Sequence, residues 1–186
     1  MNLVTILGTF QKQKHKQTKI RRQVTVTSRK KVNFLKYFLM NKMKDVMKRG
    51  ALIIFEGCDR SGKTTQCKRQ VERLTEKFGL QNNDQPSSIG MRFPDRTTEI
   101  GKAINGYLQN TSELDDHVIH LLFTANRWEK VSELKAALER GQHVIVDRYS
   151  FSGIAFSSAK DGMSLEWCRQ PERGLPKPGM FIILGF

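Results

Sequence analysis

The chain has 186 residues, three cysteines and a formal net charge of +14 at pH 7. This length suits one domain with a hydrophobic core of its own. The cysteines show no C-x-x-C spacing, which disfavours a disulfide framework and a zinc site and favours a reducing compartment. No apolar run is long enough to span a bilayer and no secretory signal pattern is visible, so neither a membrane protein nor a secreted one is expected.

The positive charge is concentrated in a basic extension, residues 1–48, ahead of a nearly neutral domain, residues 49–186. Residues 1–49 hold 14 Lys and Arg and a single acid, whereas the other 137 residues hold 18 basic and 17 acidic side chains. Three interpretations of the extension remain open: a disordered tail that binds nucleic acid nonspecifically, a mitochondrial transit peptide, or sequence upstream of the true start, for which Met47 is a candidate. Lys outnumbers Arg ten to four there, which disfavours the transit peptide. The expected location is cytoplasmic or nuclear, or mitochondrial if that peptide is real.

The run from Gly57 to Thr64 fits the pattern G-x-x-x-x-G-K-[ST] at every fixed position. Apolar residues 51–56 predict a buried strand before it, and 65–78 predict an amphipathic helix after it. A phosphate-binding loop requires this context, because the loop amides and the helix N-terminus both attract an anion. Lys63 can reach the β- and γ-phosphates, and the Thr64 hydroxyl can ligate Mg²⁺. The sequence therefore predicts binding of a nucleoside triphosphate.

Strands and helices alternate through the rest of the chain. In order, the pattern predicts a polar loop over 81–88, a strand over 89–93, a helix from 98, one long helix over 114–138, a strand over 143–147, a helix from 150 and a strand over 180–184. This alternation predicts an α/β fold with a parallel sheet and a site at the carboxyl ends of the strands. The apolar stripe of the long helix comprises Leu114, Val118, Leu121, Leu122, Ala125, Trp128, Val131, Leu134 and Leu138.

Three further clusters place an arginine at a strand end or on a helix face: 92–96, 123–128 and 147–149. A phosphoryl-transfer site needs such cations because charge spreads over the phosphate oxygens as the bond breaks. Arginine suits this task because it pairs with phosphate through two nitrogens. Asp147 ends an apolar strand, which favours an indirect Mg²⁺ partner over a simple helix cap. His117 and His120 lie one helical turn apart, but no third metal ligand is evident.

These motifs, in this order, resemble those of thymidylate kinases of the eukaryotic type. The resemblance runs from Arg49 to about Ile183. Besides the phosphate loop it includes R-F-P-D-R at 92–96, L-L-F-T-A-N-R-W at 121–128, D-R-Y-S-F-S-G at 147–153 and W-C-R-Q-P at 167–171. It implies the parallel sheet flanked by helices of P-loop nucleoside monophosphate kinases. It also implies transfer of the γ-phosphate of ATP to dTMP, giving dTDP.

The resemblance implies a role for each motif residue. Its catalytic set is Asp59, Arg60, Lys63 and Arg148. Its ATP phosphate set is Gly57, Asp59, Arg60, Ser61, Gly62, Lys63, Thr64 and Thr65. Its dTMP set is Asp59, Phe93, Arg96, Phe123, Arg127, Arg148, Ser152, Gly153 and Phe156. Mg²⁺ would be held by Thr64 and, indirectly, by Asp147.

Within these sets the resemblance implies distinct tasks. Phe123 would stack on the thymine ring and Arg127 would hydrogen-bond its edge. Arg96, with Arg148, would hold the dTMP phosphate, and Asp59 would contact the sugar 3′-hydroxyl. Phe93 and Phe156 would close the nucleoside pocket. Arg60 would clamp the transferring phosphoryl group, a role that the bacterial type gives to a lid.

The chain departs from the family pattern at its C-terminal end. Family members continue past the fourth strand into a lid that covers ATP, a fifth strand and a final helix. The sequence here ends at Phe186, so the last strand and the lid are expected to be missing. A dTMP kinase remains the preferred hypothesis. The alternatives are an inactive nucleotide-binding fragment, a nucleic-acid-binding accessory protein and a different monophosphate kinase. The resemblance also suggests a homodimer formed through the long helix.

Overall fold

The computed structural model describes residues 23–26, 49–81 and 85–185. The expectations for the basic extension, residues 1–48, therefore fall outside the described residues, except that Gln23–Val26 form strand β1. No helix within the described ranges is long and apolar enough to cross a bilayer.

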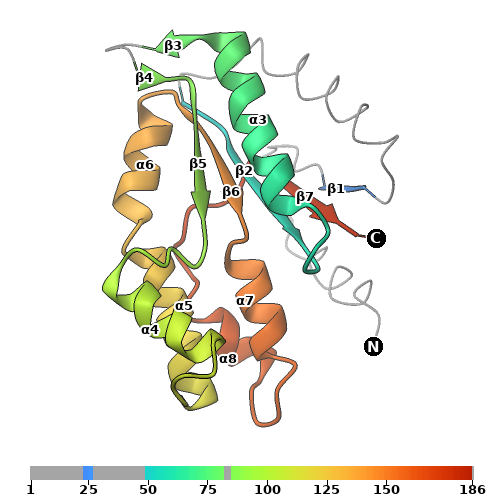
Figure 1. Ribbon diagram of the computed structural model, residues 1–186, viewed down its shortest axis with the longest axis vertical. Coiled ribbons are helices and arrows are strands. Elements are labelled where there is room, and N and C mark those ends of the chain that lie inside the picture. Colours follow the sequence, from blue (N-terminus) through green and yellow to red (C-terminus); the bar gives the residue numbers. More distant parts are fainter. Residues whose placement is uncertain (1–22, 27–48, 82–84, 186) are drawn as a thin grey trace, which may run out of the picture.

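A parallel sheet forms the centre of the domain (Figure 1). Its order across the described residues is β1-β7-β2-β6-β5, and each neighbouring pair is parallel. The later strands are β2 (Leu52–Gly57), β5 (Ser88–Arg92), β6 (His143–Asp147) and β7 (Met180–Leu184). The predicted parallel α/β fold is confirmed, and these four later strands each begin within one residue of the predicted start, whereas β1 was not predicted. Because the strands are parallel, their carboxyl ends share one edge of the sheet.

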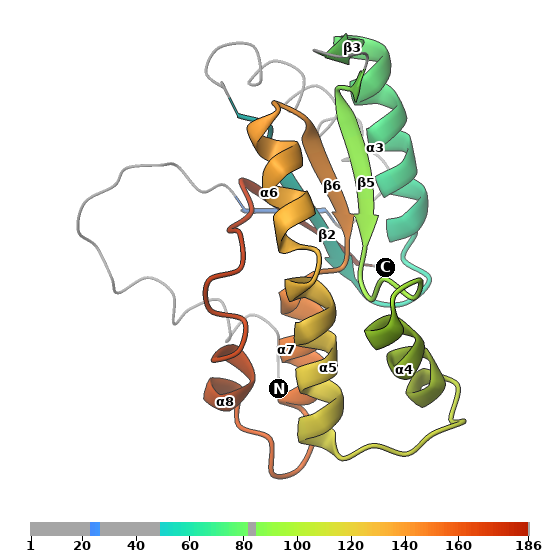
Figure 2. The ribbon, with the colours of Figure 1, turned by 90° about the vertical axis from the view of Figure 1, so that its left-hand side faces the viewer.

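Two helices cover opposite faces of this sheet, as Figure 2 shows: α3 (Lys63–Phe78) and α6 (Val131–Glu139). Successive side chains of a strand point to opposite faces. On β2, Ile53 and Phe55 accordingly belong to the apolar cluster of α3, whereas Leu52 and Ile54 belong to the cluster of α6. All four side chains are at most 2% exposed. The strand that leads into the phosphate loop is thus buried on both faces, which fixes the position of the loop.

A layer of helices lies beyond the carboxyl ends of the strands (Figure 1). It consists of α4 (Glu99–Leu108), α5 (Asp116–Trp128), α7 (Ser150–Ser157) and α8 (Leu165–Arg169). At the opposite end, β3 (Leu80–Gln81) and β4 (Gln85–Pro86) form a short antiparallel pair. The prediction of a polar loop over 81–88 is therefore wrong in part, since Gln81 belongs to β3, β4 lies within the predicted loop and β5 begins at Ser88.

The predicted single helix over 114–138 is wrong, because the structure divides it into α5 and α6. The break falls at Glu129 and Lys130, and both side chains have polar partners there. Asn126 donates to the Glu129 carboxylate at 2.6 Å, and the Lys130 ammonium contacts Asp95 at 3.0 Å. Apolar spacing continues across the break and no Pro or Gly marks it, so periodicity cannot reveal it. The break lets α6 pack on the sheet while α5 lies beyond the strand ends.

We expect Leu134→Ala to destabilise the domain, because Leu134 is 1% exposed at the centre of the α6 cluster. Removing such a side chain leaves a cavity, and the free energy of unfolding should fall by ~2–5 kcal/mol. Urea denaturation followed by circular dichroism measures the change. The matched control is Lys135→Ala, the exposed neighbour on the same helix. Equal unfolding free energies for the two variants would contradict this description of the core.

Candidate active site

The loop between β2 and α3 has the backbone shape of an anion-binding turn. Gly57, Arg60 and Gly62 have positive φ angles of 141°, 63° and 83°. At Gly57 there is also no room for a side chain, because a Cβ would lie 2.0 Å from the carbonyl oxygen of Leu184 on β7. Glycine is therefore required where the loop passes the neighbouring strand. The loop delivers its last residues directly into the first turn of α3, whose N–H groups have no earlier helical partners.

Lys63 is buried at the start of α3 and 6% exposed. Its ammonium donates to the carbonyl oxygen of Cys58 and lies 3.4 Å from the Ser61 hydroxyl. Burial, followed by the nearby positive charge of Arg148, lowers the pKa of Lys63 below its ordinary value. An anion in the loop would oppose that effect by stabilising the charged form. The Lys63 ammonium is thus bound by neutral oxygen acceptors of the loop. A phosphate group in the loop would be a stronger partner for this cation.

Thr64 and Asp147 meet although 83 residues separate them. The Thr64 hydroxyl donates to the Asp147 carboxylate at 2.6 Å, and this carboxylate is 4% exposed at the end of β6. The Arg92 Nε lies 3.7 Å from the same oxygen. Hydroxyl and carboxylate oxygens are ligands that Mg²⁺ accepts, and Mg²⁺ takes few protein ligands beside waters and phosphates. The pair therefore fits the predicted Mg²⁺ position. The described residues hold no cluster of three or more His, Cys, Asp or Glu that would form an all-protein metal site.

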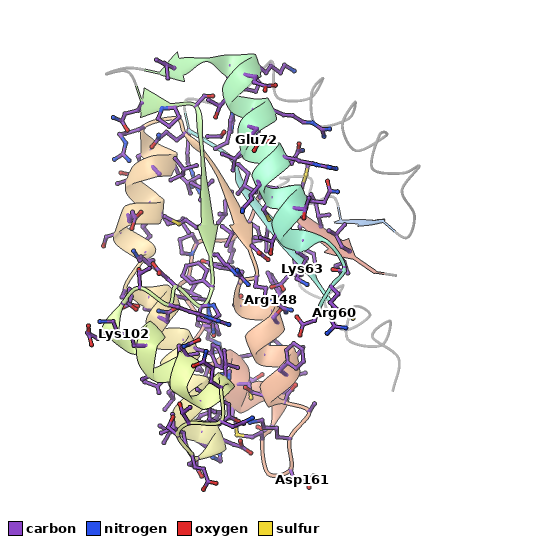
Figure 3. All side chains as sticks on the ribbon, in the orientation of Figure 1. Arg60, Lys63, Glu72, Lys102, Arg148 and Asp161 are labelled. Carbon is purple, nitrogen blue, oxygen red and sulfur yellow. The ribbon has the colours of Figure 1, made fainter. Side chains whose placement is uncertain are left out.

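Arg148 follows Asp147 and has a positive φ of 67°. Its guanidinium forms an ion pair with Asp59 of the phosphate loop and donates to the Ser152 hydroxyl at 3.1 Å. The Phe156 ring, 65% exposed, lies 6.0 Å from its Cζ. The structure thus brings four predicted site residues from two distant segments into contact. Figure 3 shows Arg60, Lys63 and Arg148 at this same edge of the sheet, next to α7.

Glu56 belongs to the site although its motif position had suggested no role. Its carboxylate is 4% exposed and accepts the backbone N–H groups of Tyr149 at 2.9 Å and Ser152 at 3.2 Å. It also accepts the Ser152 hydroxyl. Since α7 has no side-chain cap of its own, Glu56 satisfies the N–H groups of its N-cap residue Tyr149 and of Ser152 in its first turn. The only hint in the sequence is an acid that ends an otherwise apolar strand.

Arg127 lies on the buried face of α5 and is 2% exposed. Its Nε donates to Glu172 at 3.0 Å, and its Nη2 donates to the other oxygen of the same carboxylate. Gly153 of α7 approaches from the other side, where a Cβ would lie 3.2 Å from Nη2. The predicted residues Arg127 and Gly153 are therefore adjacent. Glu172, between α8 and β7, was not predicted, because nothing in the sequence pairs it with α5.

The aromatic residues expected around a nucleoside lie at different depths. Phe93 is 3% exposed and packs in the core, with its ring centroid 5.9 Å from that of Tyr149. Phe123 is half-buried on α5, one turn before Arg127. Phe156 is the most exposed of the three. Phe93 is thus a core residue of the domain. A direct contact between any of these three rings and a nucleoside stays a prediction.

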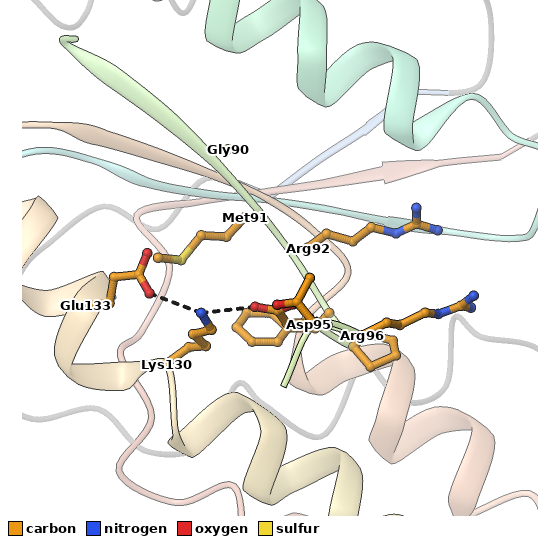
Figure 4. A pocket seen from close by; sticks show the side chains of 10 residues that line it. Gly90, Met91, Arg92, Asp95, Arg96, Lys130 and Glu133 are labelled. Carbon is orange, nitrogen blue, oxygen red and sulfur yellow. Dashed lines mark hydrogen bonds and ion pairs between the residues drawn. The ribbon is translucent and has the colours of Figure 1, made fainter. Parts of the chain in front are cut away.

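A pocket of about 380 Å³ opens beside the end of β5 (Figure 4). Asn126 of α5 holds the loop on its rim, accepting the Asp95 N–H at 2.7 Å and donating to the Asp95 carbonyl at 3.1 Å. In Figure 4 the side chains of Arg92 and Arg96 extend to the same side, away from Lys130. The lining residues are Gly90, Met91, Arg92, Phe93, Pro94, Asp95, Arg96, Thr97, Lys130 and Glu133.

The three cysteines have different environments. Cys58 is exposed in the phosphate loop, whereas Cys67 on α3 and Cys168 on α8 are buried. Burial, followed by the charge of Asp147, raises the pKa of Cys67 to about 12. Burial also raises the pKa of Cys168. All three thiols are free.

The phosphate loop and the motifs around it agree with comparisons to known proteins. The family model "Thymidylate kinase" matches residues 55–186. A thymidylate kinase of Danio rerio is 54% identical over 137 residues, which are 74% of this chain and 61% of the relative. The Homo sapiens thymidylate kinase is 49% identical, with the same coverage of 74% and 61%. The chain thus spans about three fifths of the length of these curated relatives.

Solved structures of thymidylate kinases have a similar fold. The enzyme from Candida albicans superposes with a TM-score of 0.64 at 38% identity, covering 74% of this chain and 63% of that one. The enzyme from Ehrlichia chaffeensis gives 0.63 at 30% identity, with coverage of 74% and 77%. The sequence match and the shared fold together show that this chain belongs to the thymidylate kinase family.

Proposed function

We propose that this chain transfers the γ-phosphate of ATP to dTMP, giving dTDP. The observation that carries the proposal is the convergence of Lys63, Arg148 and the Thr64–Asp147 pair at one edge of the sheet, next to the buried face of α5. One side of this arrangement suits a polyphosphate and the other suits a nucleoside. Membership of the family supplies the identity of the two substrates.

The phosphate end of the site has the charges that phosphoryl transfer requires. Arg60 is exposed in the loop and Lys63 is buried beneath it, so they can approach a phosphate chain from two sides. Arg148 is held between Asp59 and Ser152 and can face an acceptor phosphate. The acceptor is already an anion, so positioning and charge stabilisation suffice and no general base is needed. Mg²⁺ held by Thr64, with Asp147 behind it, would neutralise charge on the ATP phosphates.

The nucleoside end is formed by α5. We assign the thymine ring to the face of Phe123 and its polar edge to Arg127, one turn further along the helix. An aromatic face binds a base through stacking, and a guanidinium binds a carbonyl oxygen through hydrogen bonds. Ser152 donates to Glu56 and accepts from Arg148, so its contribution to dTMP binding is to orient Arg148.

The assay that tests the proposal is release of ADP from ATP, Mg²⁺ and dTMP by the full chain and by Lys63→Ala. We expect the variant to lose turnover by a factor on the order of 10²–10³, because it lacks one preorganised cation, while binding of dTMP is retained. Lys68→Ala, an exposed lysine further along α3, is the matched control and should keep full turnover. A folded parent that binds dTMP but releases no ADP would instead support the inactive nucleotide-binding alternative.

Phe123→Ala tests the nucleoside end separately. Loss of the stacking surface should weaken dTMP binding by ~1–3 kcal/mol, as for other base-stacking aromatics, with little effect on ATP. Isothermal titration calorimetry measures both affinities. Phe151→Ala is the control, because that ring packs against Phe181, with centroids 4.5 Å apart, outside the assigned nucleoside pocket. Unchanged dTMP affinity in Phe123→Ala would remove this residue from the pocket.

We infer a homodimer formed through α5. On α5 the predicted apolar stripe is not covered within the chain, since Val118 and Leu121 are both 45% exposed and Trp128 is 40% exposed, whereas its continuation on α6 is buried. A second copy would cover this stripe without exposing the polar face of α5. We expect sedimentation analysis to give a dimer for the parent and a monomer for Val118→Asp/Leu121→Asp. Leu165→Asp, an exposed leucine on α8, is the control. A monomeric parent would contradict the inference.

A further inference from the structure

The pair formed by Arg127 and Glu172 is almost completely removed from solvent. The two residues are 2% and 8% exposed and come from α5 and from the segment between α8 and β7. Two nitrogens of the guanidinium, Nε and Nη2, bind the two oxygens of the carboxylate. Thr124, one turn earlier on α5, donates to the same carboxylate at 2.7 Å. The pair is thus a two-pronged ion pair with an additional hydroxyl donor.

Such a pair adds little to the free energy of unfolding, but it fixes the orientation of its two side chains. The cost of removing two charges from water offsets most of their attraction, and well-packed apolar residues stabilise a core equally well. A guanidinium and a carboxylate joined by two parallel hydrogen bonds have one mutual orientation, however. Glu172 therefore fixes the plane of the Arg127 guanidinium and neutralises its charge.

This arrangement leaves one end of the guanidinium for another molecule. Nε and Nη2 are occupied by Glu172, and Nη2 also lies 3.4 Å from the Thr124 hydroxyl. Within the described part of the chain, Nη1 makes no hydrogen bond. A Cβ on Gly153 would lie 3.4 Å from Nη1, so α7 limits movement of this nitrogen. An arginine nitrogen can donate but cannot accept.

We propose that Glu172 is a positioning residue for base selection, and the inference rests on the proposed function. By fixing Arg127, Glu172 presents Nη1 to the nucleobase as a rigid donor. A pyrimidine with a carbonyl oxygen at the facing position, such as that of dTMP, can accept from it. A pyrimidine with an amino group there, such as that of dCMP, brings two donors together and leaves both unpaired, which is costly in a buried site. Neutralising the charge also prevents Arg127 from competing with Arg148 for the substrate phosphate.

The experiment compares equilibrium binding of dTMP and dCMP to the full chain and to Glu172→Gln. Glutamine keeps the volume but loses the charge and one acceptor. We expect the preference for dTMP over dCMP to fall roughly tenfold, the effect of losing a charge-assisted hydrogen bond, while ATP affinity is unchanged. In turnover assays the KM for dTMP should rise more than kcat falls. Glu166→Gln, which removes an exposed carboxylate on α8 that pairs with Arg173, should change neither value.

Two further variants separate positioning from folding. Thr124→Val removes the hydroxyl partner of Glu172 and leaves the ion pair, so it should reduce base preference in a folded protein by a smaller factor. In an Arg127→Met background, Glu172→Gln should cause no additional loss of preference, because Glu172 acts through Arg127. Circular dichroism verifies folding of each variant.

The outcomes distinguish this inference from the proposed function. If the parent prefers dTMP and both Glu172→Gln and Thr124→Val keep that preference, the inference is wrong and the proposed function stands. If the parent binds neither monophosphate, the proposed function and the inference both fail. If Glu172→Gln also lowers the preference for dTMP in the Arg127→Met background, Glu172 acts by a route other than Arg127. That result also overturns the inference.

Discussion

The arrangement of the site depends on the buried carboxylate of Glu56. This side chain lies one residue before the end of the central strand β2 and accepts the N–H groups of Tyr149 and Ser152 and the Ser152 hydroxyl. The phosphate loop begins at the next residue, so one carboxylate connects the loop to the segment that carries Arg148. Without it, the N–H groups of Tyr149 and Ser152 would lose this partner, at a cost of ~1–3 kcal/mol for each buried group left unsatisfied. The relative placement of the loop and Arg148 therefore rests on these hydrogen bonds together with the pairing of β2 and β6, in which the Arg148 N–H donates to the Phe55 carbonyl at 2.9 Å.

The helix α5 reverses the usual relation between polarity and burial. Its buried residues include His120, Thr124, Asn126 and Arg127, whereas several of its apolar residues are exposed. Each buried polar group has partners: His120, for example, contacts the Ser157 hydroxyl at 2.8 Å and the Cys168 carbonyl at 2.9 Å. Burial, the largest effect, lowers the pKa of His120 and favours its neutral form. This face is thus a rigid polar scaffold, which explains why α5 can hold functional groups in fixed positions.

The sequence predicted the sheet and the phosphate loop well because their signals are local. A buried strand, a glycine-rich turn and an amphipathic helix each depend on neighbouring residues, and the loop pattern fixes their order. The same holds for Asp147, which ends an apolar strand, and the structure places that strand beside β2. Glu56 and Glu172 could not be assigned from the sequence, because their partners lie 93 or more and 45 residues away. The break between α5 and α6 was missed because no helix-breaking residue marks it, and the contact of Lys130 with Asp95 beside it joins residues far apart in the sequence.

The distribution of the thiols gives this chain a built-in chemical reporter. Two of its three cysteines are buried, with thiols whose raised pKa values leave little of the reactive thiolate at neutral pH. The third, Cys58, is exposed, and its own carbonyl oxygen accepts the Lys63 ammonium. A thiol-specific dye will therefore attach in the phosphate loop without any engineered residue. Its fluorescence would follow the loop as Lys63 exchanges that carbonyl for a phosphate.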